Sequence, residues 1–482
     1  MSNLASLLGD LTTPTVRLGV TGLARAGKTV FITALVRNLI NEARLPFFGP
    51  AAEGRILRAY LEPQPDDDVP RFTYEEHLAV LARDPPEWPE GTRRISQLRV
   101  TIDYVTSNSL LKRLGPSRLH VDIVDYPGEW LIDLQLMGLS FTDWSAAALR
   151  TLRDPRRGVA AGPFLAFLEG LEAGAKADEQ TAITGAALFT RYLEAARGVG
   201  VADPTLGPGR FLLPGDLEGS PLLTFFPLDF AAVSKTGTSK TGASGLAPML
   251  ERRFEAYKAR VVKPFFRDHF ARLDRQIVLV DALTALDQGP AALADLEVSL
   301  GNVLQAFRPG GHGWLDFLRP RRIDRILFAA TKADHLPQAS HDRLEAILGL
   351  VTRRAAARAT FAGAEVKALA FAALRATRED EMARGRERLP CIVGTPLPGE
   401  RAGQQVFDGT KAVAVFPGDL PTDPAAVFAG SGAHATDAAV RAIRFRPPRI
   451  AAVGSTGAGI PAPWPHIRLD RALDFLIGDR LA

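Results

Sequence analysis

One stretch near the start of the chain limits its fold more than any other feature. Residues 22–29 read Gly-Leu-Ala-Arg-Ala-Gly-Lys-Thr and match the pattern G-x-x-x-x-G-K-[ST]. Apolar and polar residues alternate from Val16 to Val20, and apolar residues recur at helical spacing from Val30 onward. A strand, a glycine-bracketed loop and a helix in this order are typical of a phosphate-binding loop. A match by chance would not need to lie between a strand and a helix, so this context favours a true site.

The residue types in this motif predict how it holds phosphate. Gly22 and Gly27 let the backbone turn its N–H groups toward phosphate oxygens, and the helix that begins at Lys28 adds the positive end of its dipole. We expect Lys28 to reach the β- and γ-phosphates and Thr29 to offer its hydroxyl to Mg²⁺. The other nucleotide-contacting positions predicted here are Leu23, Ala24, Arg25, Ala26 and Val30.

A second motif follows a hydrophobic strand that ends at Val124. Asp125-Tyr126-Pro127-Gly128 matches D-x-x-G. Asp125 would hold Mg²⁺ through water, and the Gly128 N–H would contact the γ-phosphate only before hydrolysis, which makes a natural switch. Acidic turns with proline and glycine are common, but the place after a strand and downstream of a phosphate loop favours a metal-side motif.

A third motif points to the base of a nucleotide. Thr331-Lys332-Ala333-Asp334 follows a buried-type strand and matches [NT]-K-x-D. The Asp334 carboxylate can accept hydrogen bonds from guanine N1–H and the exocyclic amine, a donor pattern that adenine lacks. The stem of Lys332 would lie along the base.

The next strand ends in a turn that could complete the base site. Residues 372–375 read Ala-Ala-Leu-Arg and resemble a turn whose backbone N–H meets guanine O6. Ala373 and Leu374 are therefore predicted to contact the nucleotide. A plain strand-to-helix loop is the alternative.

Hydrolysis needs a group that orients water and a group that offsets developing charge. Glu129 directly follows D-x-x-G and would orient or deprotonate water, although a surface acid is the alternative. Arg25 lies inside the phosphate loop and would act as an arginine finger in cis, or else face solvent. The Mg²⁺-contacting threonine of the first switch is predicted to be Thr92, with Thr101 as the second choice.

Composition excludes several classes of protein. The 58 basic and 54 acidic residues give a net charge of +4, which does not argue for nucleic-acid binding. Cys391 is the only cysteine, so we expect neither a disulfide within the chain nor a thiolate metal cluster. Neither a signal-peptide pattern nor a run of 18 apolar residues is present, which predicts a cytoplasmic protein.

The order of patterns predicts an α/β fold. Buried-type strands alternate with helical segments, as in a doubly wound and mainly parallel sheet with an antiparallel strand pair at one edge. Two strands at 98–104 and 118–125 would form that pair. The 482 residues suggest two to four domains, or one domain enlarged by insertions.

The predicted phosphate-loop core comprises residues 1–130 and 271–380, with an irregular insertion at 45–95. That insertion would hold helical pieces at 55–61 and 74–82. The gap between the second and third motifs far exceeds one βα unit, so residues 131–270 should form a helical insertion domain. A β-rich extension and a closing helix, residues 381–482, would pack on the core.

The first residues carry an apolar stripe. Either they contact a membrane surface, which would place the protein peripherally at the inner membrane, or they form a short helix packed on the domain. The absence of basic flanks favours the packed helix. The stripe consists of Leu4, Leu7, Leu8 and Leu11.

These stretches resemble the YcjX family of bacterial P-loop proteins, which is linked to stress responses and variously described as ATPase or GTPase. The resemblance rests on residues 22–35, 125–130, 331–334 and the closing stretch 467–481, so it spans essentially the whole chain. It implies a GTPase core of the TRAFAC type that carries helical insertions. Thr331 and Ala372 replace the asparagine and serine usual in guanine sites, which bears on affinity for guanine more than on its selection over adenine.

The phosphate loop also resembles that of guanylate-binding proteins and atlastins. Those proteins have an arginine at the position of Arg25, and dimerisation across the nucleotide swings it into the site. The resemblance implies homodimerisation across the nucleotide for this chain as well.

Together these patterns predict a Mg²⁺-dependent switch protein that binds GTP and GDP, hydrolyses GTP and meets an unidentified protein effector. One alternative is an ATPase of the same fold in which Thr331 to Asp334 is structural. Another is a scaffold that holds nucleotide with negligible hydrolysis, or a protein that acts at the membrane surface.

Overall fold

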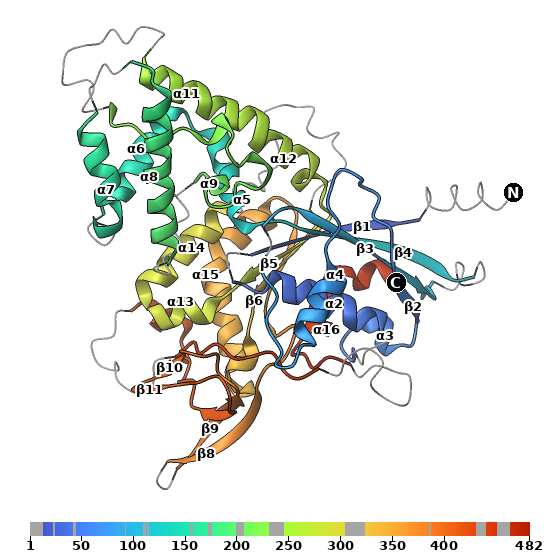
Figure 1. Ribbon diagram of the computed structural model, residues 1–482. Coiled ribbons are helices and arrows are strands. Elements are labelled where there is room, and N and C mark those ends of the chain that lie inside the picture. Colours follow the sequence, from blue (N-terminus) through green and yellow to red (C-terminus); the bar gives the residue numbers. More distant parts are fainter. Residues whose placement is uncertain are drawn as a thin grey trace, which may run out of the picture. The chain divides into compact units, whose positions relative to one another are not determined.

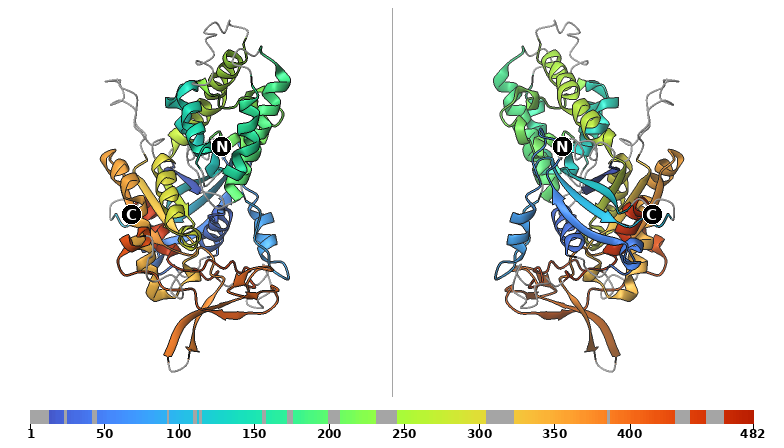
Figure 2. Two further views of the ribbon diagram at one scale, coloured as in Figure 1. Left: turned by 90° about the vertical axis from the view of Figure 1, so that its left-hand side faces the viewer. Right: turned by 90° about the vertical axis from the view of Figure 1, so that its right-hand side faces the viewer.

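The computed structural model describes residues 13–22, 25–41, 45–91, 93–108, 112, 115–154, 158–171, 176–198, 207–230, 245–303, 323–384, 387–429, 440–450 and 463–482. Leu23, Ala24, Thr92 and the apolar stripe at 4–11 lie outside these described residues. Two compact units share the chain, as labelled in Figure 1 and seen from two further sides in Figure 2. The first comprises Met1–Tyr126, Leu273–Leu293 and Arg319–Ala482, and the second Pro127–Arg272 and Ala294–Leu318.

A seven-stranded sheet in the order β2-β3-β4-β1-β5-β6-β7 organises the first unit. Strand β1 lies between β4 and β5 and runs parallel to both, and β5, β6 and β7 continue in parallel. Strand β3 is antiparallel to both β2 and β4. The strands are β1 Thr15–Gly22, β2 Ile56–Glu62, β3 Ser96–Tyr104, β4 Ser117–Asp125, β5 Arg275–Val280, β6 Arg325–Ala330 and β7 Glu365–Ala370.

The sheet is mixed, as the sequence predicted, but its antiparallel strand lies one place in from the edge. The edge belongs to β2, in a region predicted to be helical. A β-bulge between Ile56 and Arg58 explains this difference. It brings Ile56 and Ala59, three residues apart, against the same apolar core, and that spacing looks helical in the sequence.

Helices α2 (Lys28–Ile40) and α16 (Leu469–Ile477) pack against one face of the sheet. Alternate residues of the strands, such as Leu18 and Val20 of β1, point toward these helices and are at most 1% exposed. The predicted closing helix is therefore α16, which continues as a 3₁₀ turn at Gly478–Leu481. Helix α15 (His341–Phe361) packs along β6 and β7, and its buried side chains are not part of that core cluster.

The remaining elements of the first unit are short. Helices α3 (Gly49–Ala52) and α4 (Tyr74–Leu81) precede β3, and α13 (Ala282–Gln288) follows β5. The residues after β7 form a three-stranded antiparallel sheet in the order β12-β9-β8 and a small strand pair, visible as a projecting ribbon in Figure 2. These strands are β8 Arg378–Arg384, β9 Glu387–Gly394, β10 Arg401–Ala402, β11 Gln405–Val406 and β12 Val413–Val415.

The described part of the second unit is helical, with an aromatic interior. Trp144 packs on Phe189, Phe225 and Phe254 with ring centroids 5.2–6.0 Å apart. Across the described residues of the chain, no helix combines the length and the apolar character needed to cross a bilayer. The helices are α5 Gly128–Ile132, α6 Phe141–Leu152, α7 Gly158–Glu169, α8 Glu179–Gly198, α9 Gly209–Leu212, α11 Leu246–Tyr257 and α12 Lys263–Asp268, and α14 (Pro290–Val303) enters this unit from the first.

A buried carboxyl group lies inside the second unit. Asp133 accepts hydrogen bonds from the Tyr257 hydroxyl and the Gly209 N–H, both at 2.6 Å. Burial raises the pKa of Asp133 to about 6, against the opposing effect of these donors and of Arg210. Burial also raises the pKa of Tyr257, so its hydroxyl keeps the proton that it donates.

This raised pKa predicts how stability depends on pH. Unfolded, Asp133 would titrate near its ordinary value of about 4, so between pH 4 and 6 the folded state binds more protons than the unfolded state. Asp133 should therefore reduce the free energy of unfolding as the pH rises through this range, by roughly 3 kcal/mol in all. Urea unfolding of the wild type and Asp133→Asn across this range tests it, because asparagine stays neutral. Identical pH profiles for the two proteins would contradict the prediction.

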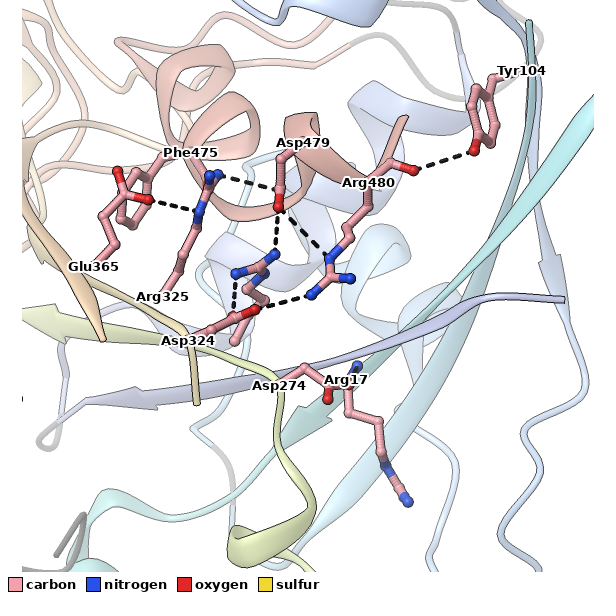
Figure 3. A network of polar contacts seen from close by, with 10 residues as sticks. Arg17, Tyr104, Asp274, Asp324, Arg325, Glu365, Phe475, Asp479 and Arg480 are labelled. Atoms are coloured by element: carbon pink, nitrogen blue, oxygen red, sulfur yellow. Dashed lines mark hydrogen bonds and ion pairs between the residues drawn. The ribbon is translucent and has the colours of Figure 1, made fainter. Parts of the chain in front are cut away.

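A polar network ties the last turn of the chain to the strands of the first unit (Figure 3). Arg275, at the start of β5 and 1% exposed, donates to Asp324 and to Asp479, the latter at 2.6 Å. Arg480 also donates to Asp324 at 2.9 Å, and Arg325 donates to Asp479 at 3.2 Å. Burial lowers the pKa of Arg275, and the charges of the two carboxylates oppose this effect. The carboxylates therefore offset the cost of burying the guanidinium.

Removing one of these carboxylates should destabilise the fold. Asp479→Ala leaves the buried guanidinium of Arg275 with Asp324 as its remaining acidic partner, and we expect a loss of about 3 kcal/mol in the free energy of unfolding. Glu381→Ala is the matched control, because its ion pair with Arg388 is exposed and should contribute less than about 1 kcal/mol. Equal urea midpoints for the two variants would show that the network does not hold the last turn.

Candidate nucleotide-binding site

The register of the sheet brings the sequence motifs to one edge. Val20 of β1 pairs with Asp125 of β4, and Gly22 pairs with Leu279 of β5. On the other side, Val280 pairs with Ala330, and Ala330 pairs with Ala370. The phosphate loop, Asp125, residues 331–334 and the turn at 372–375 therefore all follow strand ends at the carboxyl edge. In doubly wound sheets, ligands bind at this edge beside the strand where the order reverses, here β1.

The described part of the phosphate loop has a special backbone. Arg25 and Gly27 both lie in the left-handed region, with φ of 63° and 86°. A Cβ added to Gly27 would meet nothing within 4 Å, so open space faces this residue. At Gly22 a Cβ would lie 2.7 Å from the Leu279 carbonyl oxygen, so only glycine allows β1 and β5 to approach this closely.

The two polar side chains of the motif are held by backbone carbonyls. Lys28, 8% exposed, donates from Nζ to the Gly22 carbonyl at 2.9 Å, which keeps its ammonium over the loop. The Thr29 hydroxyl donates to the Glu90 carbonyl at 3.3 Å. Both side chains stay next to the backbone amides that are predicted to bind phosphate.

Residues of the D-x-x-G motif belong to both units. Asp125 is 1% exposed at the end of β4, and the hydroxyl of Tyr126 donates to Gln276 at 2.9 Å. Burial raises the pKa of Tyr126, so this hydroxyl remains a donor. Gly128 and Glu129 begin α5 in the second unit. Glu129 is 6% exposed, so the alternative of a surface acid is wrong.

The third motif is held by a residue that the sequence analysis did not single out. Lys332 adopts a left-handed conformation, with φ of 62°, and its Nζ donates to Asp281 at the end of β5. Asp281 also caps α13 by accepting from the N–H and hydroxyl of Thr284, at 3.2 and 2.8 Å. The carboxylate thus has a fixed orientation from which it positions the Lys332 side chain. The sequence did carry a signal for Asp281: an aspartate three residues before Thr284, at the start of a helix, is typical of an N-cap.

Backbone contacts position Asp334 beside the turn that follows β7. Asp334 is 4% exposed, and its Oδ2 accepts from the Ala376 N–H at 2.8 Å. Its carbonyl accepts from the Thr377 hydroxyl. One step earlier, the Ala333 N–H donates to the Phe371 carbonyl at 3.1 Å. The predicted base-reading motif and the turn therefore form one hydrogen-bonded assembly.

The backbone N–H groups of this turn differ in whether they have a hydrogen-bond acceptor, and the difference supports the predicted contacts at Ala373 and Leu374. The N–H groups of Ala372 and Arg375 donate to Ile467 and Pro465, at 3.0 and 2.8 Å, and Ala376 donates to Asp334. Within the part of the chain that the structure describes, the N–H groups of Ala373 and Leu374 have no such acceptor. The alternative of a strand-to-helix loop is wrong, because β8 follows the turn.

Pro465 and Ile467, whose carbonyls accept hydrogen bonds from the turn, could not be recognised from a local sequence pattern. They lie far along the chain from the turn, and only the tertiary fold brings them beside it. The backbone N–H of Trp464 donates to the side-chain oxygen of Asn38 in α2 at 3.2 Å, which holds this segment in place. Residues 463–468 thus connect α2, the turn and α16.

Comparison with known proteins agrees with these features. The model of the YcjX-like family, also called DUF463, matches residues 16–481. The chain belongs to the YcjX-like family. It is 38% identical over 474 residues to the Ras-like GTPase YcjX of Escherichia coli K12, a match that covers 97% of this chain and 96% of the relative. The Ras-like GTPase YcjX of Shewanella oneidensis is 34% identical over 483 residues, with 97% and 94% coverage.

Family membership and the mixed sheet agree with a phosphate-loop α/β fold. Within the described residues, no group of three or more His, Cys, Asp or Glu side chains could hold a metal ion by itself. Mg²⁺ in nucleotide sites takes one or two protein oxygens and completes its shell with phosphate and water. The Thr29 hydroxyl and the Asp125 carboxylate are donors of the required kind.

The Asp281–Lys332 pair gives a testable prediction. Asp281→Asn keeps an acceptor for the helix cap but removes the charge that holds Lys332, so GDP binding should weaken about tenfold. Calorimetry on the Asp281→Asn and Lys332→Met variants and on the double variant measures the coupling. Thr284→Ala is the control, because it disturbs the same cap and leaves the ion pair intact. Additive losses in the double variant would show that Asp281 does not act through Lys332.

Proposed function

We propose that this chain is a Mg²⁺-dependent GTPase that works as a nucleotide switch. The observation that carries the proposal combines two features at the carboxyl edge of the sheet. The Ala373 and Leu374 amides have no acceptor among the described residues, and the same turn is hydrogen-bonded to the Asp334 carboxylate through Ala376. Two N–H donors suit the O6 acceptor of guanine, and a carboxylate suits its N1–H and amine donors. Adenine carries an amine in place of O6, so it would leave these groups unpaired.

The phosphate end supports the same proposal. Left-handed residues in the loop and the N-terminus of α2 present backbone amides to an anion, and Lys28 is held beside them. Lys28 would bind the β- and γ-phosphates. Thr29 would contact Mg²⁺ directly and Asp125 would do so through water, and bound Mg²⁺ would neutralise charge on the phosphates.

Arg25, Glu129 and Gly128 would act in the hydrolysis step. Arg25 is exposed at the loop and has the reach and charge to act as a cis arginine finger, alone or after dimerisation across the nucleotide. Glu129 would orient the attacking water, and Gly128 would contact the γ-phosphate. A role in stress responses and an effector on the helical unit belong to the same proposal.

The experiment that tests base choice compares two nucleotides on two proteins. Calorimetry of nucleotide-free protein with Mg²⁺ should give GDP binding at least ~100-fold tighter than ADP binding, about 2.7 kcal/mol. Asp334→Asn should lose most of the GDP affinity and gain affinity for XDP, because xanthine carries an oxygen where guanine has its amine. Equal GDP and ADP affinities in the wild type would favour an ATPase, and tight GDP binding without GTP turnover would favour a nucleotide-holding scaffold.

A further inference from the structure

A proline-rich segment in the first unit connects the two ends of the proposed nucleotide site. Residues 84–90 read Asp-Pro-Pro-Glu-Trp-Pro-Glu and lie between α4 and β3; we call them the strap. Three prolines in seven residues restrict the backbone, so the strap has little freedom to bend within itself. Pro89 alone separates Trp88 from Glu90, so a displacement of one is passed to the other.

One end of the strap lies at the phosphate side. The Glu90 carbonyl accepts from the Thr29 hydroxyl at 3.3 Å. When a hydroxyl donates its proton, its oxygen lone pairs remain available to a metal ion. The contact therefore orients Thr29 for Mg²⁺ and need not be broken when the metal binds.

Two residues before Glu90, the strap contacts the base side through Trp88. The Trp88 indole N–H donates to the Phe445 carbonyl at 2.6 Å. The Trp88 side chain is half-buried in an apolar cluster that contains Val30 of α2, Leu374 of the turn and Trp464. Trp88 thus packs on a cluster that includes Leu374, one of the two residues whose amides would read the base.

Phe445 is itself held in place by two neighbours. Its ring meets the ring of His335 edge-on, with centroids 5.1 Å apart, and His335 directly follows Asp334. A Cβ added to Gly394 of β9 would lie 2.7 Å from the Phe445 ring, which shows how closely the ring packs on that strand. The carbonyl that accepts from Trp88 is therefore a rigid anchor, attached to both the base-reading motif and the small sheet.

We propose that Trp88 is a positioning residue that ties the strap across the bound nucleotide and sets the rate at which the nucleotide leaves. The inference rests on the proposed function, because it takes guanine nucleotide as the occupant of the site. Without the indole donor, Trp88 is held by its packing in the apolar cluster, and this part of the strap can lift from the turn. With the donor in place, release requires breaking a partly buried hydrogen bond and separating Trp88 from the apolar cluster.

Release kinetics of a fluorescent GDP analogue, with Mg²⁺, test this proposal by stopped flow. Trp88→Phe keeps one aromatic ring in the cluster and removes the N–H donor together with the five-membered ring that carries it, and release should be about tenfold faster, equivalent to about 1.4 kcal/mol. Trp144→Phe is the matched control. It removes an indole bond of the same kind, to the Gly207 carbonyl at 3.3 Å in the second unit, and should release nucleotide at the wild-type rate.

A purely structural role for Trp88 would lower the melting temperature without changing release. If Trp88→Phe does not fold, Pro89→Gly takes its place, because it makes the strap flexible and keeps every side chain that contacts the site. Release at the wild-type rate from a folded Trp88→Phe, or from Pro89→Gly in its place, overturns the inference and leaves the proposed function standing. Failure of the wild type to bind guanine nucleotide overturns both.

Discussion

The close approach of β1 to β5 is the constraint on which the first unit depends. Gly22 faces β5 at a distance that excludes a side chain, because a Cβ there would lie 2.7 Å from the backbone carbonyl of Leu279. This approach places β1 in the middle of a sheet that continues in opposite directions on its two sides. The end of β1 thereby becomes the point beside which the predicted phosphate, metal and base-reading groups all follow strand ends.

Motifs whose chemistry is contiguous in the sequence could be predicted from it. The strand, loop and helix around residues 22–29, the aspartate at the end of β4 and the carboxylate at 334 are each encoded within a few residues. Family membership was also predictable, because the same stretches carry it. The strand β2 could not be predicted, because its bulge gives apolar residues a helical spacing.

Residues that hold the site in shape lie far apart in the sequence and share no local pattern. The turn at 372–376 is braced by residues near 465, Asp334 is oriented by the turn, and Trp88 donates to Phe445. Each of these contacts depends on backbone groups, which every residue carries. A sequence pattern therefore cannot identify them, even when the residues that they position are easy to recognise.

The position of α16 has a consequence for how the protein is made. The phosphate loop is synthesised early, whereas the helix that covers the same face of the sheet comes from residues 469–477 and is fastened by Asp479 and Arg480. A nascent chain must therefore expose the apolar face of β5 and β6 until this segment leaves the ribosome. The turn at 372–375 also lacks its hydrogen-bonding partners at Pro465 and Ile467 until then, so the carboxyl edge of the sheet is completed by the segment that is made last.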